Sequence, residues 1–94
     1  MTMIKKQPNI VFIMVDQLAA ASLNCYGGGV SSTPVLDWLA EEGTRFDRCY
    51  ASSTICAPSR ATFLTGRSAE IHGVTDNNLV LQNDMPTYAH VLRE

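Results

Sequence analysis

The sequence predicts an α/β protein with a largely parallel central sheet flanked by helices. The first observation is the run NIVFIMV from Asn9 to Val15, because a continuous apolar stretch rich in β-branched residues is typical of a strand buried on both faces of a parallel sheet. The second is the order strand, helix, strand, helix along the chain. The 94 residues, 46% of them hydrophobic and 17% charged, fit a single globular domain at most.

The first predicted strand is followed by polar residues, a loop and a helix. Asp16 and Gln17 come directly after the strand, at the end where open α/β sheets bind ligands. Residues 18–32 lose periodicity and hold three consecutive glycines, which indicates a loop. Thr33 and Pro34 then supply an N-cap and a first helical residue. We expect this helix to place its apolar face on Val35, Leu36, Leu39 and Ala40 and to stop at Gly43.

The second half of the chain predicts another strand and two more helices. TRFDRCYA at 44–51 alternates weakly and is interpreted as a strand that includes Cys49. A helix is expected from Pro58 to Gly66, then an irregular loop over 67–84 that carries His72, then a helix from Pro86 with His90 on its solvent side. The last helical pattern has no stop signal, so we expect the sequence to be the N-terminal part of a larger domain.

Charge and composition disfavour several classes of protein. The net charge is −2 and the basic residues are scattered, so nucleic acid is not an expected partner. No apolar segment approaches the roughly 20 residues that cross a bilayer. The apolar run at 10–15 is also shorter than the core of a secretory signal, and we therefore expect a cytoplasmic protein with no membrane partner. None of the three cysteines has the CxxC spacing of a metal or redox site.

The most informative stretch is CAPSRATFLTGR, Cys56 to Arg67. A side chain in the first turn of a helix faces unpaired N–H groups and the positive end of the helix dipole, which favour an anion. Arg60 lies one turn further on the same side and offers two parallel donors to a sulfate or phosphate group. Asp16 and Gln17 offer hard oxygen ligands, which suit Ca²⁺, Mg²⁺ or Mn²⁺.

Each of these residues also has an ordinary structural interpretation. A free cysteine such as Cys56 is more often a small buried hydrophobe than a nucleophile. Asp16 could cap a helix, and Arg60 could be a surface residue. Cys25 and Cys49 are interpreted as structural, and His72 and His90 as non-catalytic.

The motif resembles the signature of the sulfatase family, CxPSR followed by a short helical turn and TGR. PNIVFIMVDQ is similar to the first strand and metal-binding aspartate of that family, and TPVLDWLAEEGTRFDRCYAS and MPTYAHVLRE are similar to later segments of it. The resemblance covers nearly all 94 residues. It implies that residues 1–94 are the N-terminal fragment of a sulfatase catalytic domain with an alkaline-phosphatase-like fold.

The resemblance also implies roles for particular residues. Cys56 would be converted by a formylglycine-generating enzyme to formylglycine, whose hydrate attacks the sulfate ester with one hydroxyl and expels the bound sulfate with the other. Arg60 would hold that hydrate. Asp16, Gln17 and the modified Cys56 would ligate a divalent metal, Ca²⁺ first and Mg²⁺ or Mn²⁺ as alternatives. Asn77 would contact the substrate, as in the choline-sulfatase and phosphonate-hydrolase branch.

Two departures from the pattern of the sulfatase family leave alternative functions open. The pair Asp16-Gln17 replaces the two aspartates of most sulfatases, so a phosphonate monoester or phosphodiester hydrolase is the alternative to a sulfatase that cleaves a small-molecule sulfate ester. The remaining metal ligands and leaving-group residues of the family fall outside these 94 residues, and we expect the chain alone to be inactive. A non-catalytic fragment or pseudoenzyme module, in which Cys56 stays a thiol, is the alternative from another class.

Overall fold

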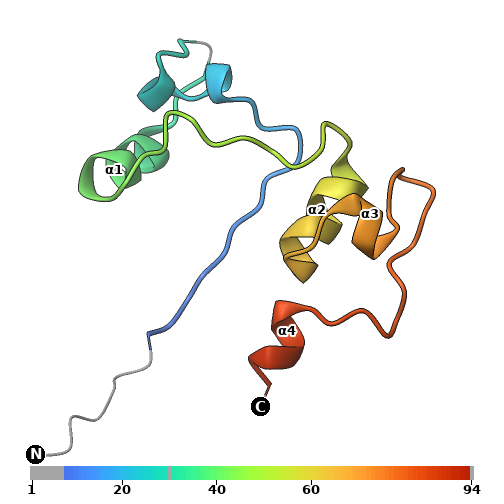
Figure 1. Cartoon of the computed structure of the whole chain (residues 1–94). Helices are drawn as coiled ribbons and strands as arrows, with labels where there is room; N and C mark the ends of the chain where they lie inside the picture. Colours follow the sequence, from blue (N-terminus) through green and yellow to red (C-terminus); the bar gives the residue numbers. More distant parts are fainter. Residues whose placement is uncertain (1–7, 30, 94) are drawn as a thin grey trace, which may run out of the picture. The chain divides into compact units, whose positions relative to one another are not determined.

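The computed structural model describes residues 8–29 and 31–93, and its elements are two 3-10 turns and four α-helices (Figure 1). In chain order they are η1 (Ala20–Ser22), η2 (Asn24–Tyr26), α1 (Pro34–Glu42), α2 (Cys56–Thr65), α3 (Ala69–His72) and α4 (Tyr88–Val91). The chain divides after Asp47 into two compact units. The first holds η1, η2 and α1, and the second holds α2, α3 and α4.

Neither predicted strand forms within the described part of the chain. Residues 9–15 have no regular structure, and the apolar side chains from Ile10 to Val15 are 42–83% exposed. Residues 44–51 are likewise irregular, and Cys49 is exposed instead of packed in a strand. The two predicted strands are thus not confirmed in the described residues, because a strand forms only when a neighbouring strand takes up its backbone hydrogen bonds.

The first unit confirms the predicted helix in detail. Pro34 is the first residue of α1, Thr33 occupies the N-cap position although its side chain makes no capping hydrogen bond, and Gly43 ends the helix with an N–H that donates to Leu39 O at 3.0 Å. The apolar side chains of Val35, Leu36 and Leu39 are nevertheless 67%, 40% and 50% exposed, and no residue of α1 is buried. The sequence therefore forms the helix from local signals alone, without the packing that such a face is suited to.

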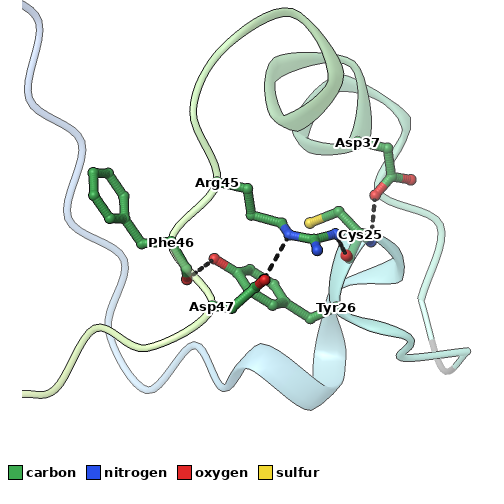
Figure 2. Close-up of polar contacts among 6 residues, drawn as sticks. All are labelled: Cys25, Tyr26, Asp37, Arg45, Phe46 and Asp47. Atoms are coloured by element: carbon green, nitrogen blue, oxygen red, sulfur yellow. Dashed lines mark hydrogen bonds and ion pairs between the residues drawn. The ribbon is translucent and has the colours of Figure 1, made fainter.

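Polar contacts hold the first unit together where apolar packing is absent. Asp37 Oδ1 accepts the backbone N–H of Cys25 at 2.9 Å and the hydroxyl of Thr33 at 3.3 Å, which ties η2 to the start of α1. Figure 2 shows the contact between Asp37 and Cys25 together with the contacts of Arg45. Arg45 donates to the Cys25 carbonyl and to Asp47 Oδ1, and its guanidinium lies 5.3 Å from the ring centre of Tyr26. Cys25 is thus held by its backbone, as a structural residue would be.

The second unit contains the buried side chains of the described residues. Pro58 and Ala61 of α2 are buried, as are His72 at the end of α3 and Val74 just after it. α2 contacts α3 and α4, and the rings of Phe63 on α2 and Tyr88 on α4 meet edge to face with centroids 5.9 Å apart. This small core fixes the surroundings of α2.

The predicted helices of the second unit are present with shifted boundaries. α2 begins at Cys56, two residues before the expected start, because a proline in the first turn lacks only an N–H that would have no partner within the helix. The predicted end at Gly66 is confirmed. The loop predicted over 67–84 contains the short helix α3, so His72 is helical and buried instead of lying on a loop. The last helix, α4, spans only Tyr88–Val91, and His90 on it is exposed as expected.

Candidate active site

The N-terminus of α2 carries Cys56 and is capped by a side chain from far along the chain. Asn77 Oδ1 accepts the backbone N–H of Ala57 at 2.9 Å and lies 3.1 Å from Cys56 Sγ, whose S–H points to it as donor. The preceding residue, Ile55, gives no side-chain cap to the helix. Because Ala57 N–H requires an acceptor, the carbonyl oxygen of Asn77 and not its NH₂ group faces the helix. Asn77 therefore fills the position that an anion would take at a helix N-terminus.

The turn around Asn77 is ordered by its neighbours. Asp76 Oδ1 accepts both the backbone N–H of Asn78 at 3.1 Å and its side-chain amide at 3.0 Å. The backbone N–H of Leu79 then donates to the Asp76 carbonyl at 3.2 Å. An aspartate that bonds the backbone two residues on fixes a tight turn, and here the turn presents Asn77 to the start of α2.

A buried histidine lies between α2 and this turn. His72 is only 3% exposed, and both of its ring nitrogens have partners: Nε2 lies 3.0 Å from Thr62 Oγ1 of α2, and Nδ1 accepts the backbone N–H of Val74 at 3.1 Å. Since Nδ1 is an acceptor, these bonds assign the proton to Nε2, which donates to the Thr62 hydroxyl. The ring thus joins α2 to the segment that leads to Asn77.

At the C-terminal end of α2, the residues Thr65, Gly66 and Arg67 terminate the helix. Thr65 Oγ1 donates to the Ala61 carbonyl at 2.7 Å and accepts the backbone N–H of Arg67 at 3.2 Å. Gly66 has a φ of 66°, the left-handed conformation that commonly ends a helix. The threonine hydroxyl and the glycine together stop α2 and direct the chain into α3.

Arg60 lies one helical turn beyond Cys56 on the same face of α2, and both side chains are exposed. The one-turn spacing of Cys56 and Arg60 on a single helix is the spacing that the sequence predicted. Cys56 and Arg60, beside the Asn77 cap, have the chemistry that suits a small tetrahedral oxyanion, and this role stays a prediction.

Asp16 and Gln17 belong to the first unit, where they form an exposed turn. Gln17 has a φ of 54°, which few residues other than glycine adopt. Two adjacent side chains with oxygen donors suit a hard divalent cation, so the donor set fits the metal that the sequence predicts, although it is smaller than a complete ligand set. Residues 8–29 and 31–93 contain no group of three or more His, Cys, Asp or Glu side chains placed to hold a metal ion.

Of the predicted site residues, Cys56, Arg60 and Asn77 thus lie in one unit, with Cys56 and Asn77 in direct contact. Sequence reasoning missed the roles of Thr62 and His72. The signal for His72 was weak, because an isolated histidine between Ile71 and Gly73 does not reveal that a threonine ten residues earlier faces it.

Comparison with known proteins identifies the family of this chain. The family model for sulfatases matches residues 8–94. The chain is 42% identical over 89 residues to an N-acetylglucosamine-6-O-sulfatase of Bacteroides thetaiotaomicron, covering 95% of this chain and 16% of that protein. It is 41% identical over 87 residues to a choline-sulfatase of Rhizobium meliloti, covering 93% of this chain and 17% of that protein. A third relative, human arylsulfatase D, is 46% identical over 72 residues, 77% of this chain and 12% of that protein.

The chain belongs to the sulfatase family, as the signature predicted, and membership implies the alkaline-phosphatase-like fold. It spans 16% of the length of the N-acetylglucosamine-6-O-sulfatase and 17% of that of the choline-sulfatase. No solved structure matches it. No helix in the described part of the chain is both long and apolar enough to cross a membrane.

Proposed function

We propose that the protein carrying this chain is a sulfuric ester hydrolase that cleaves a small-molecule sulfate ester, with formylglycine derived from Cys56 as nucleophile and a divalent metal as cofactor. The observation that carries the proposal is the contact of Cys56 Sγ and Ala57 N–H with Asn77 Oδ1 at the start of α2. It brings together a residue of the sulfatase signature and the residue expected to contact substrate. Maturation of Cys56 would require a formylglycine-generating enzyme as a transient partner.

The residues of this chain have separate tasks in that reaction. The modified Cys56 supplies the attacking hydroxyl, which would donate to Asn77 Oδ1 as the thiol does here. Asn77 has an NH₂ group left to donate to a sulfate oxygen. Arg60 offers parallel N–H donors to the charge that grows on the sulfuryl group. Asp16, Gln17 and the modified Cys56 would hold the metal, Ca²⁺ in our proposal, which neutralises negative charge on the substrate oxygens.

A phosphonate monoester or phosphodiester hydrolase is the second candidate for the same residues. The observation that favours it is the pair Asp16-Gln17, which brings one negative charge fewer to the metal than two aspartates would. Sulfate monoesters, phosphonate monoesters and phosphodiesters each carry one negative charge, so the support for this candidate is that the Asp-Gln pair resembles the branch of the family that includes phosphonate hydrolases. The third candidate, a non-catalytic module, requires that Cys56 remain a thiol.

The experiment is to express the complete gene with a formylglycine-generating enzyme, isolate the peptide that carries Cys56, and assay the protein on matched sulfate and phosphonate esters. We expect an aldehyde at position 56 and preferential hydrolysis of the sulfate ester, which Cys56→Ala abolishes while Cys49→Ala does not. Preference for the phosphonate would establish the second candidate. An intact thiol with no hydrolysis of either ester would establish the third.

The remaining expectations belong to the same proposal. In the complete protein, residues 9–15 are proposed to form a strand of a largely parallel sheet, with residues 1–94 as the N-terminal fragment of the catalytic domain. The protein is proposed to act in the cytoplasm without a nucleic-acid or membrane partner. The scattered basic residues and the shortness of the apolar run at 10–15 support this.

A further inference from the structure

We infer that His72 is a positioning residue of the site: it ties the segment that carries Asn77 to α2 and so holds Asn77 Oδ1 on Cys56 and on the Ala57 N–H. The importance of this tie for turnover rests on the proposed function above. The tie itself is a structural statement that can be tested without any enzymatic activity.

Hydrogen bonds of the second unit join α2 to the following segment of the chain at two places. α2 contributes Thr62, whose hydroxyl accepts from His72 Nε2, and His72 Nδ1 accepts from Val74 N–H. Val74 is 2% exposed, and three residues later Asn77 returns to the start of α2. The segment 73–77 is therefore fastened to the same helix at two places, one at its middle and one at its N-terminus.

The tie through His72 is the stronger candidate for a fixed anchor, because the His72 side chain and its bond to Val74 N–H are buried and its bond to Thr62 is partly buried. A hydrogen bond within a protein interior resists opening, since a partner left behind loses its hydrogen bond and has no water to replace it. The contact at the other end involves Cys56, Ala57 and Asn77, where the proposed function would bind substrate, and Cys56 and Asn77 are exposed. An exposed contact of this kind holds its geometry only if the segment behind it is fixed.

The role is one of position and not of chemistry. His72 is 3% exposed and both ring nitrogens are already engaged, so neither is available to a substrate. One ring nitrogen faces a side chain of α2, and the other faces the backbone of the segment that leads to Asn77. His72 can therefore influence the reaction only through what it holds in place.

Two variants each remove the hydrogen bond between His72 and Thr62, one by changing each partner. His72→Asn keeps an acceptor for the Val74 N–H, in the same way that Asp76 Oδ1 accepts from the residue two positions on, but it is too short to reach Thr62. Thr62→Val removes the hydroxyl with little change of shape. The matched control is His90→Asn, since His90 is an exposed histidine whose Nδ1 bonds to Thr87 at the start of α4.

The first measurement is the hydrogen-exchange rate of the Ala57 amide in the product of the complete gene, because that amide donates to Asn77 Oδ1. We expect exchange to become about tenfold faster in His72→Asn, Thr62→Val and Asn77→Ala, and to stay within about twofold in His90→Asn. The double variant of His72→Asn and Thr62→Val should exchange no faster than either alone. Unchanged exchange in both single variants would overturn the inference, whatever the activity of the protein.

The second measurement is a double-mutant cycle in kcat/KM on the sulfate ester. His72→Asn is expected to lower kcat/KM about tenfold alone, and to have an effect of less than about twofold when Asn77 is already alanine. If His72→Asn lowers kcat/KM by the same factor in the parent protein and in Asn77→Ala, His72 does not act through Asn77. The loss would then reflect only a general effect on stability. If no ester is hydrolysed, the proposed function fails, while the exchange experiment still decides the inference.

Discussion

At the scale of single residues, Asn77 has two roles, as the cap of α2 and as the proposed substrate contact. Substitutions of Asn77 can separate these two roles. Its Oδ1 caps α2 through Ala57 N–H, and its amide group is free to bind the substrate in our proposal. Asn77→Asp keeps an acceptor for the cap but places a negative charge where the ester anion binds. Two like charges about 4 Å apart repel strongly even in a partly solvated site, so KM for the sulfate ester should rise at least about tenfold.

The same variant should leave exchange of the Ala57 amide slow, since a carboxylate at a helix N-terminus is a favourable cap. Asn77→Ala is the matched comparison, because it removes the cap and the substrate contact together. If Asn77→Asp and Asn77→Ala raise KM equally, the added charge has no effect and Asn77 does not face the anion.

Glu70, in the first turn of α3, gives a prediction for pH. Its pKa lies below the ordinary value of 4.5, chiefly because the Ser68 side chain donates a hydrogen bond to the carboxylate and further because of its own backbone N–H. A pKa lowered by folding means that the ionised form stabilises α3. This contribution is complete above pH 4.5 and is lost as the pH falls through the lowered value. Ser68→Ala should raise the pKa of Glu70 toward 4.5, measured from the side-chain carboxyl signal by NMR, and an unchanged pKa would show that Ser68 is not the cause.

At the scale of elements, the end of α2 depends on Gly66. Its φ of 66° is open to glycine but costly to a residue with a Cβ, and an added Cβ would meet no atom within 4 Å, so the cost is conformational alone. Gly66→Ala should destabilise the last turn of α2 by about 1 kcal/mol, measured by hydrogen exchange of the backbone amide at this position, which donates to Thr62 O. Gly29→Ala is the control, because that position is equally open and has no positive φ, and an equal effect at both would contradict this explanation.

The contrast between helices and strands shows how much of the fold follows from sequence. Helices carry their signals locally, so Thr33, Pro34 and Gly43 were enough to place α1, and Gly66 was enough to end α2. A strand needs a neighbouring strand from elsewhere in the chain, and the apolar pattern of residues 9–15 does not indicate which segment would pair with it. The site divides in the same way: the spacing of Cys56 and Arg60 on one helix was predictable, whereas the tie between Thr62 and His72 depends on tertiary packing.

At the scale of the whole molecule, the described residues expose an unusual amount of apolar surface. The side chains from Ile10 to Val15 and those on the apolar face of α1 are largely exposed. Contiguous exposed apolar surface marks a site of further contact. The chain covers only 16–17% of the N-acetylglucosamine-6-O-sulfatase and the choline-sulfatase, and in our proposal the remainder of a catalytic domain would cover this surface.

Two valines test whether residues 9–15 become a buried strand in the product of the complete gene. Val11 and Val80 are 83% and 87% exposed in this structure, but the sequence places Val11 in a strand covered on both faces and Val80 in a loop. Val11→Asp would then bury an unpaired carboxylate and lower the free energy of unfolding by about 3 kcal/mol or more, whereas Val80→Asp should change it by less than about 0.5 kcal/mol. Urea unfolding of the two variants beside the parent protein measures both. Equal tolerance of aspartate at the two positions would mean that the segment stays exposed and that the predicted parallel sheet is built without it.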